Sequence, residues 1–132
     1  QILDKKVLNQ VIQLDNCFYL GDKPYNEYVD YVKQFNIAIV PYVVGDQESG
    51  ANTIKVYEYI AASCQIVATR GCGVENLKEF VNIANDKYEF SDYLQRIIRN
   101  KEYSTKCTLP IEFTWEDISN NFLKILYNEN NA

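Results

Sequence analysis

Two charged residues stand one helical turn apart in a segment that is otherwise apolar or small. Lys55 and Glu58 lie within residues 52–63, NTIKVYEYIAAS. On a helical period they share one face, and the remaining faces are largely apolar. A charge on a buried helix is costly unless it is paired, reaches solvent or faces a ligand. The spacing alone leaves two interpretations open: a local ion pair worth about 0.2–0.5 kcal/mol, and a polar ligand site.

The loop before this helix favours the ligand site. It brings Gly50, Asn52 and Thr53 to the predicted helix start. Free backbone N–H groups and the helix dipole favour an anion such as phosphate there, and glycine lets the backbone come close to it. Lys55 would add positive charge, and Glu58 would accept hydrogen bonds from a pair of hydroxyls. A nucleotide offers both groups, although small-residue loops before helices are common.

Predicted strands and helices alternate along the chain. Short apolar runs without polar alternation predict buried strands at 16–21, 37–42, 65–69 and 81–85. Helical spacing predicts helices at 3–14, 22–35, 52–63, 89–100 and 114–128. The last helix is expected to begin after a Thr114 cap, to pack the Trp115 indole under that cap, and to bury an apolar stripe. The order predicts an α/β fold with a mostly parallel sheet of about four strands.

Ligands of such sheets bind at the carboxyl ends of the strands. In this sequence those ends are residues 21–23, 42–52 and 69–74, which are also the polar, glycine-bearing loops. Fold class and composition therefore predict the same edge as the functional one.

Composition narrows the classes of function. The 132 residues suit a single domain over 1–132, in which 101–111 links to the last helix. A net charge of −5 argues against a general nucleic-acid binder, which usually has a basic face. The absence of histidine excludes a histidine base or a histidine zinc ligand from this chain. Four cysteines without a C-x-x-C pair predict free thiols, with Cys17 and Cys64 as small core residues.

The chain has neither a signal peptide nor a run of about 18 apolar residues, and we expect a soluble, cytoplasmic protein. It starts without methionine, in what reads as the middle of a helix, so we expect a part of a longer protein.

Nearly the whole chain resembles, in order, the carboxyl-terminal half of glycosyltransferases with the two-domain GT-B fold, most of all bacterial family-1-type enzymes of polysaccharide synthesis. The segments that carry this likeness are NCFYLG, the tyrosine-rich helix, IAIVPY, K-x-x-E-Y-x-A, QIVAT and the tryptophan helix. The matching positions are Asn16, Leu20, Gly21, Tyr25, Pro41, Lys55, Glu58, Tyr59, Ala61 and Trp115.

The resemblance implies a Rossmann-like domain that binds a nucleotide-sugar donor in its cleft, with no metal and no further cofactor. Glu58 would bind the ribose hydroxyls, and the helix start at 50–53 would face the diphosphate. The loop that holds Gly21 and Asp22 would lie near the base. Lys55 would support the phosphates or the sugar.

Two departures limit what carries over. Many relatives have a glutamate where Gly50 stands, and a proline is often found where Thr53 stands, so no catalytic residue is assigned. Relatives also have an amino-terminal acceptor domain and about two further strands. We therefore expect this chain alone to be inactive, to need that domain as its partner, and to expose a sheet edge suited to dimerisation. The longer protein could associate with a membrane surface.

Three classes of function compete. The first is the donor-binding part of a glycosyltransferase that transfers a sugar to a glycan or a lipid-linked acceptor. The alternative is a non-catalytic α/β binding or interaction module that kept the fold and lost donor binding. A receiver-type signalling domain is disfavoured, because no acidic pair follows a first strand and no lysine ends a late one.

Overall fold

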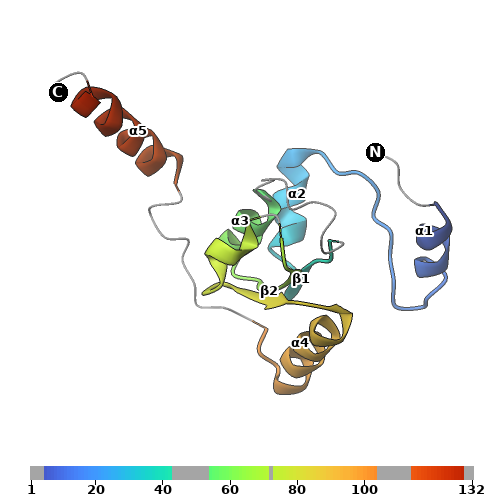
Figure 1. The fold of residues 1–132 in the computed structure, drawn as a ribbon. Helices are drawn as coiled ribbons and strands as arrows, with labels where there is room; N and C mark the ends of the chain where they lie inside the picture. Colours follow the sequence, from blue (N-terminus) through green and yellow to red (C-terminus); the bar gives the residue numbers. More distant parts are fainter. Residues whose placement is uncertain (1–4, 43–53, 72, 104–113, 130–132) are drawn as a thin grey trace. The chain divides into compact units, whose positions relative to one another are not determined.

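The chain folds as alternating helices and strands in the computed structural model, which describes residues 5–42, 54–71, 73–103 and 114–129 (Figure 1). The elements in order are α1 (Lys5–Val11), α2 (Tyr25–Val32), β1 (Ile37–Val40), α3 (Ile54–Ala61), β2 (Gln65–Thr69), the 3₁₀ helix η1 (Val74–Leu77), β3 (Val81–Ala84), α4 (Lys87–Asn100) and α5 (Trp115–Glu129). The chain divides into two compact units, Gln1–Asp30 and Tyr31–Ala132. The second unit holds the sheet.

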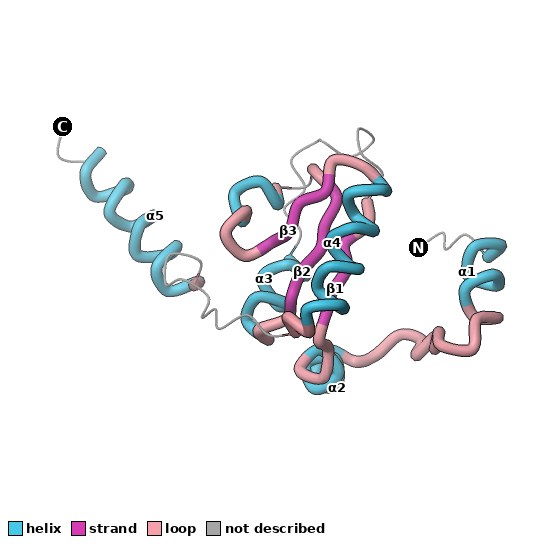
Figure 2. The backbone as a smooth tube through the Cα atoms, turned by 90° about the horizontal axis from the view of Figure 1, so that it is seen from below, coloured by secondary structure: helices cyan, strands magenta, loops and turns pink. Residues whose placement is uncertain are grey.

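A three-stranded parallel sheet in the order β1-β2-β3 forms the centre of the second unit (Figure 2). Ile37 pairs with Gln65 at one end of β1, and Val40 pairs with Ala68 at the other. β3 pairs with the other side of β2, from Ile66 with Val81 to Thr69 with Ala84. The predicted α/β class with a parallel sheet is therefore confirmed.

The middle strand is buried on both faces. Ile66, Val67 and Ala68 are each 0 % exposed, as expected of a parallel strand covered on either side. α3 lies on one face of the sheet and α4 on the other (Figure 1). α3 buries Val56 and Ile60 in this core. The β-branched residues of the strands and the apolar positions of the helices thus explain why a helix packs on each face of the sheet.

A tight turn links α3 to β2. Ser63 adopts the left-handed conformation, with φ of 60°. The backbone N–H of Cys64 donates to the carbonyl of Tyr59 over 3.0 Å, which satisfies a carbonyl left open at the helix end. Cys64 itself is 1 % exposed, and burial raises the pKa of its thiol. The prediction of Cys64 as a small core residue is confirmed, whereas Cys17 is only partly buried.

The predicted strand at 16–21 is wrong. These residues have no regular secondary structure, and Phe18, Tyr19 and Leu20 are 82 %, 59 % and 50 % exposed. An apolar run becomes a strand only where a neighbouring strand accepts its backbone hydrogen bonds, and no described strand pairs with this run. The described residues therefore contain three strands of the four predicted.

The last helix meets one of its three expectations. Its cap is confirmed, because the N–H of Asp117 donates to Thr114 Oγ1 over 3.2 Å. The indole of Trp115 is 82 % exposed, so its predicted packing under the cap is wrong. The predicted buried stripe is also exposed, through Ile118, Phe122, Leu123 and Ile125. A helical stripe identifies the face that another element could cover, and it does not supply the covering element.

No helix among the described residues combines the length and the apolar character needed to cross a bilayer.

Replacing Ser63 with glycine is expected to stabilise the fold by about 1 kcal/mol, because a side chain in the left-handed region is strained and glycine is not. Urea denaturation followed by circular dichroism measures the change in free energy of unfolding. Ser91→Gly, inside α4, is the matched control and should destabilise by about 0.5 kcal/mol. Equal destabilisation by both changes would contradict the assigned conformation of Ser63.

Candidate ligand site at the carboxyl edge of the sheet

A cavity of about 320 Å³ lies at the carboxyl edge of the sheet. Its lining comes from the segment after β1, the end of β2 and the first turn of α4 with its cap: Pro41, Tyr42, Thr69, Asp86, Lys87 and Phe90. Parallel strands bring all their carboxyl ends to one edge, which explains why segments far apart in sequence meet here. This is also the edge where ligands of open α/β sheets bind.

Thr69 ties two strands together at the cavity. Its hydroxyl lies 2.7 Å from the carbonyl oxygen of Tyr42 and 3.3 Å from that of Val40. The hydroxyl has one proton, so the nearer carbonyl of Tyr42 is the main acceptor. The next residue, Arg70, donates its backbone N–H to the carbonyl of Ala84 over 3.0 Å. The ends of β1, β2 and β3 are thus held in fixed positions around the cavity.

The start of α4 is capped by its own side chains. Asp86 Oδ1 accepts hydrogen bonds from the backbone N–H groups of Tyr88 (2.8 Å) and Glu89 (2.9 Å). Glu89 Oε2 accepts from the backbone N–H of Asn85 (2.8 Å) and from its side-chain amide (2.9 Å). This reciprocal use of two carboxylates resembles a capping box. Two of the N–H groups that could have bound a phosphate at this helix start, those of Tyr88 and Glu89, are therefore already bonded within the protein.

The hydrogen bonds to Glu89 favour its charged form. The backbone and side chain of Asn85 lower the pKa of this carboxyl from its ordinary 4.5, with a smaller contribution from the hydroxyl of Tyr93, 3.2 Å away. The pKa of Tyr93 is raised, mainly by desolvation of its hydroxyl and to a smaller extent by the hydrogen bond that this hydroxyl donates to Glu89. Glu89 is thus a structural carboxylate that holds the start of α4, and Asp86 is the carboxylate that lines the cavity.

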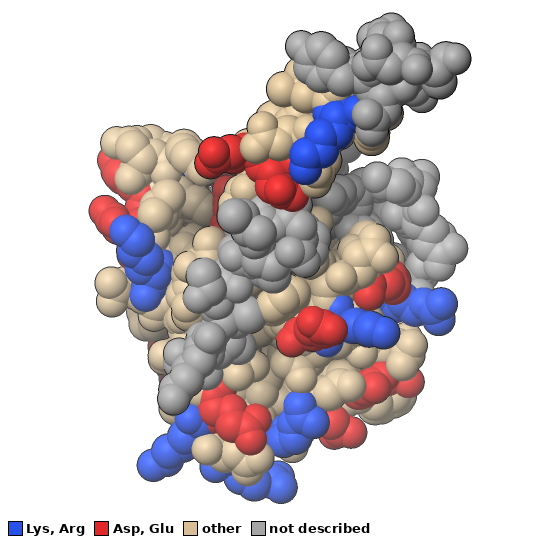
Figure 3. Space-filling view, turned by 90° about the vertical axis from the view of Figure 1, so that its left-hand side faces the viewer, with Lys and Arg blue, Asp and Glu red and all other residues tan. Residues whose placement is uncertain are grey.

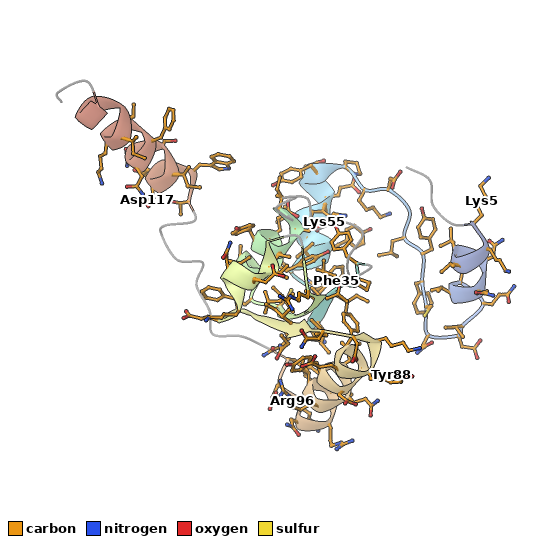
Figure 4. All side chains as sticks on the ribbon, in the orientation of Figure 1. Lys5, Phe35, Lys55, Tyr88, Arg96 and Asp117 are labelled. Atoms are coloured by element: carbon orange, nitrogen blue, oxygen red, sulfur yellow. The ribbon has the colours of Figure 1, made fainter. Side chains whose placement is uncertain are left out.

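The two charged residues predicted as a site lie on α3. Lys55, which is labelled in Figure 4, is exposed in its first turn. Glu58 is half-buried one turn later. Within the part of the chain that the structure describes, no ion pair joins them. The structure thus does not show the local Lys–Glu pair among the described residues, and the ligand site at these two residues stays a prediction. α3 follows β1 in a parallel crossover, so its first turn belongs to the carboxyl side of the sheet.

The other predicted site residues fall elsewhere. Gly50, Asn52 and Thr53 lie outside the described residues. Gly21 and Asp22 belong to the unit Gln1–Asp30. Gly21 has a φ of +68°, which favours glycine, and both residues are exposed. The structure thus places Lys55 and Glu58 on one helix and leaves their combination with the other five untested.

Charge on the surface is mixed. Figure 3 shows acidic and basic side chains interspersed over the face that it presents. Among the described residues no three His, Cys, Asp or Glu side chains gather in a way that could hold a metal ion. No family model, curated protein or solved structure matches the chain.

Two of the six residues that line the cavity were anticipated as part of the functional edge. Tyr42 and Thr69 stand in loops that the sequence assigned to the functional edge, whereas Asp86, Lys87 and Phe90 were missed. The signal was present as D-x-x-E at Asp86 and Glu89, a helix-start pattern directly after the last strand. Applying it would have started α4 at Lys87 and placed its cap at the carboxyl edge.

Thr69→Val is expected to lower the free energy of unfolding by about 1 kcal/mol, because it removes the hydroxyl that bonds the Tyr42 carbonyl. Thr69→Ser keeps the hydroxyl and is the control. Urea denaturation of both variants measures the difference. Equal free energies of unfolding for the Thr69→Val and Thr69→Ser variants would show that this hydrogen bond does not stabilise the fold.

Glu89→Gln is expected to destabilise the protein at neutral pH, and the difference from wild type should shrink in acid. The folded-state pKa of Glu89 lies below its unfolded value. The stabilisation is therefore complete above the unfolded pKa and is lost as the pH falls through the folded one. Denaturation series from neutral pH to about pH 3 measure this, with the exposed Glu79→Gln as control. A difference that stays constant across the series would contradict the assignment.

Proposed function

We propose that this chain is the donor-binding part of a glycosyltransferase, which holds a nucleotide-sugar at the carboxyl edge of its parallel sheet. The observation that carries the proposal is the cavity at this edge, whose lining combines two aromatic rings, the hydroxyl of Thr69, one acidic residue and one basic residue. A site that binds one ring of such a donor needs these groups, because rings stack on apolar surfaces and polar groups fix orientation. The resemblance in sequence supports the same class.

Lys55 and Glu58 extend the proposed site onto α3. They stand in the first two turns of the helix that follows β1, and no ion pair joins them within the described residues. In the proposal, the carboxylate of Glu58 accepts hydrogen bonds from the ribose hydroxyls, and the ammonium of Lys55 lies near the phosphates. A carboxylate that receives two hydroxyls makes charge-assisted hydrogen bonds, which are stronger than neutral ones.

The reaction of the longer protein would be transfer of a hexose to a glycan or a lipid-linked acceptor in polysaccharide synthesis, on the cytoplasmic side. The acceptor would be held by a separate amino-terminal domain, and this chain would supply the donor. No cofactor beyond the nucleotide-sugar substrate is proposed.

A second candidate is an interaction module without donor binding. It is favoured by the apolar stripe on α5, where Phe122 and Ile125 are 60 % and 57 % exposed. Exposed apolar stripes of this kind are typical of surfaces that bind another protein. The two candidates differ in nucleotide binding, which only the first requires.

Glu58→Ala is expected to weaken binding of uridine or guanosine diphosphate by about tenfold or more, because it removes hydrogen bonds to a charged acceptor. Isothermal titration calorimetry on the full chain measures both dissociation constants. Glu79→Ala removes an exposed carboxylate outside the site and should leave the affinity unchanged. Equal affinities for the wild type and the Glu58 variant would refute the role of Glu58. Absence of any nucleotide binding would favour the interaction module.

A further inference from the structure

The cavity at the carboxyl edge is small for a whole nucleotide-sugar. Its volume of about 320 Å³ lies at the lower end of the roughly 300–1,000 Å³ that ligand pockets span. One ring of a ligand fits such a space, and the rest of the ligand must extend beyond it. The lining residues therefore decide which ring it accepts.

The charges around the cavity disfavour a phosphate. The backbone N–H groups of Tyr88 and Glu89 are already bonded to Asp86 Oδ1, so two of the donors at this helix start are taken and cannot bind an anion. The carboxylate of Asp86 repels an anion directly. Lys87 offsets that charge, but its ammonium lies over the ring of Tyr88, 5.0 Å from the centroid. The lining has one acidic and one basic residue and therefore no net positive charge to attract an anion, which favours an uncharged ligand group.

The remaining features suit a ring with one apolar face and several hydroxyls. Tyr42 and Phe90 provide aromatic surface from two different segments, and Tyr42 is 38 % exposed. Among the described residues no hydrogen bond reaches the second oxygen of Asp86, so this oxygen can accept from hydroxyls. A pyranose presents apolar C–H groups on one face and hydroxyls around its rim. It can stack on the aromatic rings and donate to Asp86 at the same time.

We propose that this cavity binds an uncharged saccharide ring, with Tyr42 and Phe90 as stacking walls and Asp86 as the hydroxyl acceptor. The ring is either the sugar of the nucleotide-sugar donor or a separate saccharide. The donor assignment rests on the proposed function, and the separate saccharide does not.

Saturation-transfer NMR on the full chain tests the proposal with methyl α-glucoside, UDP-glucose and UDP as probes. Phe90→Leu keeps an apolar side chain and removes the ring, and Asp86→Asn keeps a helix cap and removes the charge. Tyr42→Leu tests the opposite wall and remains informative if a change in α4 prevents folding, which circular dichroism detects. Asp92→Asn on the exposed side of α4 is the control.

Each cavity variant is expected to weaken saccharide binding by about tenfold, in line with the energy of aromatic contacts and charged hydrogen bonds, and to leave UDP binding unchanged. If the ring is the donor sugar, the loss appears with UDP-glucose. If it is a separate saccharide, the loss appears with the glucoside alone.

Saccharide binding that survives Phe90→Leu and Tyr42→Leu would overturn the proposal. The absence of saturation transfer to the glucose rings of both methyl α-glucoside and UDP-glucose would also overturn it. Retained UDP binding in that case would leave the donor function standing. Failure of UDP and of both sugars to bind would overturn the two proposals together.

Discussion

Parallel pairing on both sides of β2 is the constraint on which the rest of the structure depends. The core of this strand is completely buried, so a shift of its register would move apolar side chains out of the core. Fixed pairing with β1 and β3 forces all three carboxyl ends to one edge. That edge collects Tyr42, Thr69 and Asp86 from segments that are distant in sequence. The cavity is thus a geometric consequence of the parallel sheet.

Local hydrogen bonds then determine which ligand groups the carboxyl edge of the sheet can bind. Thr69 joins the ends of β1 and β2, and Asp86 and Glu89 close the start of α4. A free helix start would have suited phosphate, but two N–H groups of this one are bonded to the carboxylate of Asp86. The same carboxylates set the chemistry of the cavity, since one of them keeps an oxygen available for hydroxyls. Stability and proposed recognition therefore depend on the same few side chains.

The sequence predicted most elements of the second unit because their patterns are local. Residues 65–69 form β2 as predicted, and β1 ends at Val40 because Pro41 lacks the N–H that would continue the ladder. The run at 16–21 failed because strand formation depends on a partner that no local pattern specifies. Lys55 and Glu58 were found from helical spacing. Only Tyr42 and Thr69 of the cavity lining were predicted, because the lining depends on which strand ends become neighbours.

The central claim is that the carboxyl edge of the sheet binds the ligand. Amide chemical-shift mapping on titration with a nucleotide-diphosphate sugar tests it most directly, because the two edges of one sheet serve as each other's control. The account predicts shifts concentrated at Tyr42, Thr69 and 86–90, with little change at the amino ends of the strands, Ile37 and Val81. Shifts confined to those amino ends, or no shifts at saturating ligand, would contradict it.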